Sequence, residues 1–130
     1  MKTISNQELA KIGEDIAASY LTNGGYRVLC RNFQTKQGEV DIIVEKHQQI
    51  IFVEVKTRSY HSIQSAVDNV NYKKQLHITK TAQVYCKQNP QFDKYNTRFD
   101  VIIVLYDSYN DSYSIKHLPD AFLPIADEPY

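Results

Sequence analysis

The chain has little of several features that would assign a protein class at once. Only two of its 130 residues are cysteines, Cys30 and Cys86, too few and too far apart for a zinc cluster or a disulfide framework. No apolar run approaches the ~20 residues that a membrane-spanning helix needs. The first residues also lack the apolar segment of a signal peptide. We therefore expect a cytoplasmic protein without a membrane partner, in which both cysteines pack as small hydrophobic side chains.

Net charge is also absent, because 15 Lys and Arg residues balance 15 Asp and Glu residues. The total charge thus gives no argument for nucleic-acid binding. The distribution is uneven, however: between Lys56 and Lys87 there are six Lys and Arg residues and a single acid, Asp68. A local basic surface of this kind suits a phosphate backbone, although a solvated helix face produces the same pattern.

The hydrophobic content of 42% is that of an ordinary globular protein, and the length suits one domain. Ser5 and Glu8 have the spacing of a capping box, and apolar residues at helical spacing follow them. Gly24 and Gly25 supply a stop, so we expect a first helix over residues 6–23. A first strand follows over 26–33, with Val28 and Cys30 on one face and Leu29 on the other.

Two strands rich in Val, Ile and Phe come next, over residues 38–45 and 50–57, joined by a break short enough for a hairpin. A second helix runs from about Val67 or Val70 to Gln88, where Asn89 and Pro90 end it. Strands over 98–106 and 113–118 complete the pattern. The sequence predicts one α/β domain over residues 1–118, with a mixed sheet flanked by helices, and a partly ordered tail over 119–130.

Charged residues interrupt the two hairpin strands, where an ion needs a partner, a metal or solvent. Glu54 and Lys56 are two residues apart and share a face, and Asp41 lies on the preceding strand. Two carboxylates, with the backbone carbonyl of Val55 as a third oxygen, suit Mg²⁺ or Mn²⁺. Lys56 could orient a metal-bound water or stabilise charge on phosphate oxygens, and Glu14 could add a carboxylate from the first helix.

Each of these residues also has a simpler interpretation. Glu54 and Lys56 could form an ordinary salt bridge on a strand face, and Glu14 could be a surface residue at a helix flank. Arg98 and Asp100 could be a structural ion pair or part of the site. Arg58 leaves the strand just beyond Lys56, which makes it the next candidate for a phosphate contact.

The chain as a whole resembles the YraN-like family of small uncharacterised bacterial proteins. Through the order of its elements and the Asp…Glu-x-Lys pattern, it also resembles the PD-(D/E)XK, restriction-endonuclease-like nucleases, and it is similar to archaeal Holliday-junction resolvases. The matching pieces cover nearly the whole chain: Gly13, Glu14, Ala17, Ala18, Tyr20, Leu21, Gly25, Tyr26, Asn32, residues 38–41, residues 52–56, Arg58, Lys74, Gln75, Ala82, Tyr85 and residues 98–101.

The resemblance implies a restriction-endonuclease-like αβββαβ core. It also implies that Glu14, Asp41 and Glu54 surround a divalent metal, with Lys56 as catalytic base or charge stabiliser. Lys74 and Gln75 would face the site or the nucleic-acid backbone. We add Arg58, Lys73 and Lys80 as the expected contacts of a salt-sensitive DNA surface.

Two functions follow as hypotheses. The first is a Mg-dependent endodeoxyribonuclease that cuts branched or damaged DNA in repair or recombination. A resolvase that cuts two symmetric strands is expected to be a two-fold homodimer. The second is a non-catalytic nucleic-acid-binding module that acts through a partner. The sequence does not distinguish DNA from RNA.

Overall fold

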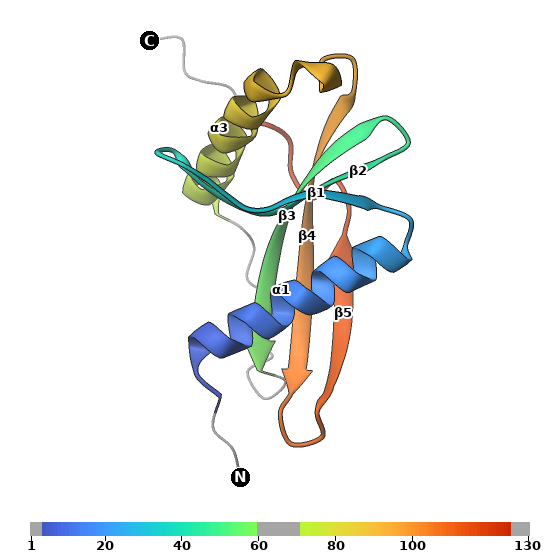
Figure 1. The fold of residues 1–130 in the computed structure, drawn as a ribbon. Helices are drawn as coiled ribbons and strands as arrows, with labels where there is room; N and C mark the ends of the chain where they lie inside the picture. Colours follow the sequence, from blue (N-terminus) through green and yellow to red (C-terminus); the bar gives the residue numbers. More distant parts are fainter. Residues whose placement is uncertain (1–3, 60–70, 126–130) are drawn as a thin grey trace.

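The computed structural model describes residues 4–59 and 71–125. The elements follow in the order α1 (Asn6–Asn23), β1 (Arg27–Thr35), β2 (Gly38–Lys46), β3 (Gln49–Ser59), α3 (Tyr72–Gln88), the 3₁₀ turn η2 (Pro90–Phe92), β4 (Asn96–Asp107) and β5 (Ser112–Leu118). Figure 1 shows α1 crossing one side of the strands and α3 lying away from it on the other. None of the helices among these residues is long and apolar enough to cross a membrane.

The five strands form one sheet in the order β1-β2-β3-β4-β5. The pairs β1–β2, β2–β3 and β4–β5 are antiparallel, whereas β3 and β4 run parallel. The connection between the parallel strands contains α3, as a crossover between parallel strands requires. The predicted α/β class with a mixed sheet and flanking helices is therefore confirmed.

Helix α1 has the predicted bounds because its ends are encoded locally. The Ser5 hydroxyl accepts a hydrogen bond from the Glu8 N–H, and the Glu8 carboxylate accepts one from the Ser5 N–H, which completes the capping box. The Gly24 N–H closes the last turn on the carbonyls of Tyr20 and Leu21. Gly25 follows with a φ of 89°, a conformation that favours glycine.

The hairpin between β2 and β3 turns on His47 and Gln48, whose φ angles are 52° and 61°. Positive φ at both positions is what a two-residue type I′ turn needs, so the predicted hairpin is confirmed. Helix α3 begins at Tyr72, with Asn71 as its N-cap. The predicted starts at Val67 or Val70 lie outside the described residues.

The prediction that Val28 and Cys30 share a face of β1 is wrong. The pairing of β1 with β2 shifts by one residue between Val28 and Cys30, which is a β-bulge. Val28 packs with the α1-side core, whereas Cys30 and Leu29 pack with the α3-side core. The inserted residue at the bulge reverses the alternation on which the prediction depended.

The sheet separates two hydrophobic cores. Between α1 and the sheet lie Ala17, Leu21 and the inward side chains of β2, β3 and β4, including Val53 and Ile102. Between α3 and the sheet lie Ile78, Ala82 and Tyr85 with Phe52 and Phe99. These two layers hold α1 and α3 on opposite faces of β3, so side chains from both helices can reach the strand that carries Glu54.

Residues 119–125 continue from β5 back across the α3-side core. The Ala121 N–H donates to the Phe99 carbonyl at 2.7 Å, and the Phe122 ring stacks on Phe99. The Ile125 N–H donates to the Thr79 hydroxyl of α3 at 3.2 Å. The first part of the expected tail is therefore packed against the domain, and residues 126–130 lie outside the described residues.

Candidate active site

The strands β2 and β3 separate at Asp41. Their pairing ends at Ile42↔Val53, and beyond that point the N–H of Val55 donates to the Asp41 carboxylate at 2.8 Å instead of to a backbone carbonyl of β2. Val40 packs in the α3-side core, whereas Ile42 packs in the α1-side core. Strict alternation would put both on one face, so the pleat is broken at Asp41.

The neighbouring strand is irregular at the same level. The pairs Arg31↔Ile42 and Phe33↔Val40 flank Asn32 in β1, and Asn32 has a left-handed φ of 54°. Asparagine adopts this conformation more readily than most residues. The irregularity turns the Asp41 side chain toward β3, where it bridges the gap between the two strands.

Glu54 faces the same gap and is nearly buried, with 5% of its surface exposed. Burial, a hydrogen bond to Glu54 and the negative charge of Glu54 together raise the pKa of Asp41 to about 9. The hydrogen bond from the Val55 N–H acts in the opposite direction, and the charge of Glu14 adds to the increase. The two carboxylates are thus close enough to share a proton or a cation.

Lys74 of α3 supplies a positive charge to this pair. Its ammonium lies 2.6 Å from Glu54 Oε2. The contact is an ion pair without the alignment of a hydrogen bond, so among the described residues this buried oxygen has no hydrogen-bond partner. The resemblance placed Lys74 at the site or at the nucleic-acid backbone, and the structure brings it directly to Glu54.

Glu14 reaches the site because α1 lies unusually close to β3. A Cβ atom at Gly13 would lie 1.8 Å from the Thr57 hydroxyl oxygen, so only glycine permits this approach. The next residue, Glu14, lines the same cleft as Asp41 and Glu54. Its carboxylate also pairs with Arg31 of β1 at 3.7 Å.

Two clefts open on the carboxylate pair. The cleft between α1 and β3 has a volume of about 490 Å³ and includes Glu14, Val55, Thr57 and Arg58 in its lining. The cleft beside α3 has a volume of about 410 Å³ and includes Gly38, Asn71, Lys73 and His77. Asp41, Glu54 and Lys74 line both clefts, so they form the boundary where the two meet.

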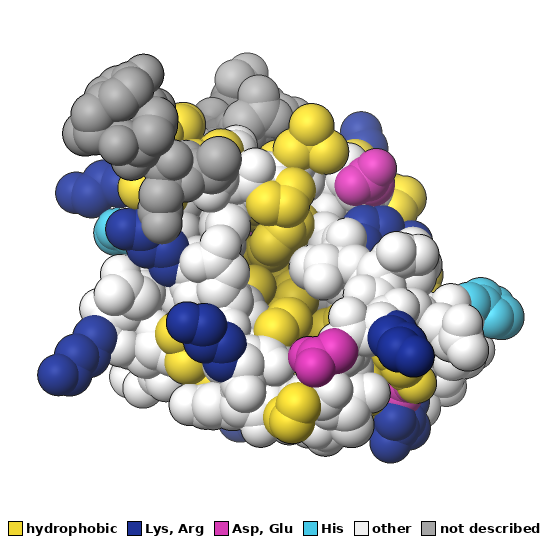
Figure 2. Space-filling view, turned by 90° about the horizontal axis from the view of Figure 1, so that it is seen from above, with side chains coloured by type: hydrophobic (Ala, Val, Ile, Leu, Met, Phe, Trp, Pro, Cys, Tyr) yellow, Lys and Arg dark blue, Asp and Glu magenta, His cyan; other side chains and the backbone are white. Residues whose placement is uncertain are grey.

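Three of the predicted nucleic-acid contacts therefore lie in the clefts: Arg58, Lys73 and Lys74. Lys80 and Gln75 are half-buried on α3 and are not among the described residues that line either cleft. On the end of the molecule shown in Figure 2, Lys and Arg side chains are dispersed around a strip of apolar side chains. That face does not carry one continuous basic patch.

Lys56 has a different position from the other members of the predicted site. It is buried, with 9% of its surface exposed, and it is not among the described residues that line the two clefts. Alternation from Phe52, a member of the α3-side core, puts Lys56 and Glu54 on the α3 side of the sheet. The shared face of Glu54 and Lys56 agrees with the prediction, and among the described residues only Glu54 of the two lines the clefts.

The site offers a divalent cation the carboxylates of Asp41 and Glu54. Within residues 4–59 and 71–125, no three Asp, Glu, His or Cys side chains gather in a group that could hold a metal ion. Mg²⁺, however, needs only one or two protein carboxylates, since water and substrate oxygens complete its shell. Asp41 and Glu54 provide this pair, and Glu54 Oε2, which has an ion pair with Lys74 but no hydrogen-bond partner among the described residues, is a suitable metal ligand. The residues present fit such an ion.

Sequence reasoning missed two contributors to this region, Arg31 and Asn71. Arg31 pairs with both Glu14 and Asp15 from a neighbouring strand. Asn71 caps α3 through a hydrogen bond from the Lys74 N–H at 2.9 Å, and it also lines the α3-side cleft. An Asn before a helical segment is a local capping signal that could have found it. The pairing of Arg31 with α1 depends on tertiary packing and has no local signal.

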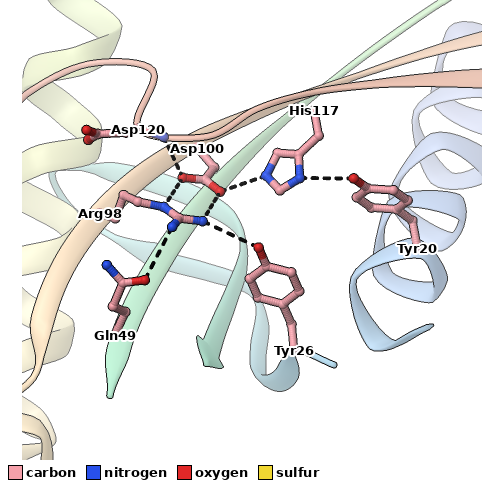
Figure 3. Close-up of polar contacts among 7 residues, drawn as sticks. All are labelled: Tyr20, Tyr26, Gln49, Arg98, Asp100, His117 and Asp120. Carbon is pink, nitrogen blue, oxygen red and sulfur yellow. Dashed lines mark hydrogen bonds and ion pairs between the residues drawn. The ribbon is translucent and has the colours of Figure 1, made fainter. Parts of the chain in front are cut away.

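Arg98 and Asp100 belong to a separate polar cluster, shown in Figure 3. The fully buried Asp100 carboxylate accepts hydrogen bonds from the Arg98 guanidinium at 2.8 and 2.9 Å and from the Asp120 N–H at 3.0 Å. His117 Nε2 lies 2.7 Å from the same carboxylate, and His117 Nδ1 lies 3.1 Å from the Tyr20 hydroxyl.

This cluster joins β4, β5 and the C-terminal half of α1. Its Arg98 also donates to Gln49 at 3.3 Å and to Tyr26 at 3.5 Å. Neither Arg98 nor Asp100 is among the described residues that line the two clefts. Of the two interpretations left open by the sequence, the structural ion pair is the one that the contacts support.

Comparisons with known proteins place the chain among uncharacterised relatives. Residues 13–104 match the family model described as "Uncharacterised protein family UPF0102". A UPF0102 protein of Clostridium kluyveri is 45% identical over 117 residues, which cover 90% of this chain and 95% of the relative. UPF0102 proteins of Clostridium botulinum strain 657 and Clostridium tetani are 44% and 42% identical over the same coverage. The names of these relatives state no activity.

Proposed function

The chain belongs to the uncharacterised protein family UPF0102, and from the chemistry of its site we propose that it is a metal-dependent endonuclease that hydrolyses phosphodiester bonds in DNA. The observation that carries the proposal is the pair Asp41 and Glu54 at the junction of two clefts. Holding a half-buried carboxylate against a buried one is unfavourable unless a cation or a proton compensates them. A protein that used these positions only for stability would gain more from apolar side chains.

Asp41 and Glu54 would hold a Mg²⁺ or Mn²⁺ ion, with the Val55 carbonyl as a third oxygen, and Glu14 in the α1-side cleft would contribute through a water molecule. When bound, such an ion polarises a phosphate and lowers the pKa of a water molecule. Arg58 and Lys73 line the clefts on either side and would hold the phosphate backbone. Lys56, which is buried on the α3 side of the sheet, stays a proposed charge stabiliser.

The superfamily resemblance supports this proposal through the order of elements. A helix followed by three antiparallel strands, a crossover helix and a parallel strand is the arrangement expected of a restriction-endonuclease-like core. Folds host many functions, so the argument depends on the carboxylates rather than on the architecture. Branched or damaged DNA as substrate, a homodimer and a role in repair or recombination stay part of the proposal, and RNA is the competing substrate.

The test is cleavage of a four-way junction, a flap and plain duplex DNA in Mg²⁺ and Mn²⁺. We expect Asp41→Ala and Glu54→Ala to lose metal-dependent cleavage while keeping the circular-dichroism spectrum of the wild type. Glu45→Gln is a matched control, because Glu45 lies on the same strand as Asp41 and pairs instead with Arg27. Cleavage that survives in both alanine variants, in preparations free of contaminating nuclease, would refute the site assignment.

A second candidate function is a non-catalytic nucleic-acid-binding module, and the Lys74–Glu54 ion pair is the observation that favours it. An internal cation that already neutralises Glu54 makes a metal unnecessary for folding. This candidate predicts DNA binding that is independent of divalent ions and unaffected by Asp41→Ala. Arg58→Gln and Lys73→Gln should weaken binding under either function and reduce the salt slope by about one for each lost phosphate contact.

A further inference from the structure

Lys74 occupies a distinctive position in the site. It lines both clefts together with the two carboxylates, and its side chain is 55% exposed although it reaches a carboxylate that is 5% exposed. Its ammonium therefore extends from solvent onto a buried charge. A long, flexible lysine side chain can hold such a position and also leave it without any change in the fold.

The first turn of α3 holds the Lys74 backbone above Glu54. The Asn71 side chain accepts a hydrogen bond from the Lys74 N–H at 2.9 Å, and the Asn71 carbonyl accepts one from the Gln75 N–H at 2.9 Å. The N-cap thus fixes the point from which the side chain departs. Only the exposed methylene chain and the ammonium need to move when the ion pair opens.

The charges around Glu54 explain why the pair forms. A buried carboxylate without a partner is costly, and Glu54 also faces a second carboxylate, Asp41. Among the described residues, Lys74 is the cation within ion-pair distance of Glu54. Its ammonium lies on Glu54 Oε2, an oxygen that a divalent ion held by Asp41 and Glu54 would also use.

We propose that Lys74 is an internal counter-ion of Glu54 that leaves when a divalent cation binds, and that the released ammonium then binds a nucleic-acid phosphate in the adjoining clefts. The inference rests on the proposed metal-dependent function. It makes metal binding and nucleic-acid binding mutually reinforcing through one side chain: metal frees Lys74 for phosphate, and phosphate draws Lys74 away from the metal ligand. The protein would bind nucleic acid tightly only in its metal-loaded form.

The first test is calorimetric titration of Mn²⁺ into metal-free protein without DNA. Lys74→Met removes the ammonium that competes with the metal for Glu54. The substitution takes a charge-assisted contact away from the metal-free state only, so that state becomes less stable relative to the metal-bound one. We therefore expect metal affinity to rise about tenfold. Lys73→Met is the matched control: it removes the same charge from the adjacent residue, which lines the α3-side cleft. Equal affinity in wild type and Lys74→Met, or equal gains in both variants, would overturn the inference.

The second test measures binding of an uncleaved four-way junction with and without Ca²⁺. We expect Ca²⁺ to tighten binding by the wild type, and to do so much less in Lys74→Met. Lys74→Gln keeps a hydrogen-bond donor beside Glu54 and serves if the methionine variant fails to fold. An undiminished Ca²⁺ effect in the folded variant would overturn the inference.

These outcomes separate the inference from the function on which it rests. If the wild type binds Mn²⁺ and cleaves DNA but Lys74→Met shows no change in metal affinity, only the counter-ion role is wrong. If neither the wild type nor Lys74→Met binds metal, with or without DNA, both the endonuclease proposal and the counter-ion role are wrong.

Discussion

The raised pKa of Asp41 predicts how stability depends on pH. Burial, the hydrogen bond to Glu54 and the charge of Glu54 raise this pKa from 3.8 to about 9. Between these two values the native protein keeps a proton that the unfolded chain releases. The contribution of Asp41 to stability is therefore fully present below the unfolded pKa and is lost as the pH rises through the folded one. The free energy of unfolding should fall by up to about 1.4 kcal/mol per pH unit across this window.

The assay is urea unfolding of metal-free protein at half-unit steps from pH 5 to pH 8. Other groups titrate in the same range, so the informative quantity is the difference between the wild type and Asp41→Asn. The amide cannot ionise but can still accept the Val55 N–H bond. We expect the variant to be less stable than, or similar to, the wild type at pH 5 and clearly more stable at pH 8.

The magnitude makes this test decisive. Even half of the maximal slope over three pH units amounts to about 2 kcal/mol, a large part of the stability of a small domain. Parallel pH profiles for the two proteins would refute the reasoning, because they would mean that Asp41 is ionised in the native state. Divalent ions give a further check: if the two carboxylates hold a cation, saturating Mn²⁺ should flatten the profile of the wild type and leave that of Asp41→Asn less affected.

Two further predictions concern packing and the polar cluster of Figure 3. Gly13→Ala should lower the free energy of unfolding by about 1–3 kcal/mol, because its Cβ would lie 1.8 Å from the Thr57 hydroxyl oxygen. Urea unfolding measures this loss. The control is Gly24→Ala, which should cost much less because its Cβ would meet no atom closer than 3.4 Å. Equal losses in the two variants would contradict the close approach. Burial acts to raise the pKa of Asp100, but hydrogen bonds from His117, Arg98 and the Asp120 N–H hold it below the ordinary value. The stability that Asp100 contributes is therefore present above pH 3.8 and is lost as the pH falls through its lower folded pKa. In this acid range the free energy of unfolding should fall more steeply with decreasing pH in the wild type than in Asp100→Asn. Identical slopes in the two proteins would contradict the role given to the cluster.

Much of the architecture could be predicted from local signals. The capping box at Ser5 and Glu8, the helical spacing that follows it and the glycines after Asn23 place α1 at its observed bounds. The hairpin of β2 and β3 also follows from its apolar strands and short polar break, and it puts Asp41 and Glu54 on adjacent strands. These features could be predicted because each depends on residues that are close together in the sequence.

The faces of individual side chains were less predictable, because a strand's alternation can be reset by one residue. The bulge after Val28 moves Cys30 to the α3 side, and the broken pleat at Asp41 turns its carboxylate to the Val55 N–H. The bulge after Val28 has no turn residue or charge pattern that marks it in the sequence. Asn32 and Asp41 mark a polar interruption at the second irregularity, but they do not fix the direction of the Asp41 side chain. Each irregularity changes which side chains meet.

The sequence alone therefore determined the class of the fold, the order of its elements and the two carboxylates that lie on neighbouring strands. Only the tertiary structure decided that α1 approaches β3 at Gly13 and that Arg31 pairs with Glu14. It also decided that Lys74 contacts Glu54, whereas Lys56 is not among the described residues that line the clefts. The physical reason is the range of the interactions. Helix caps, turns and periodicity act over a few residues, whereas the charges around the site come from elements separated by tens of residues and meet only when both helices pack on the sheet.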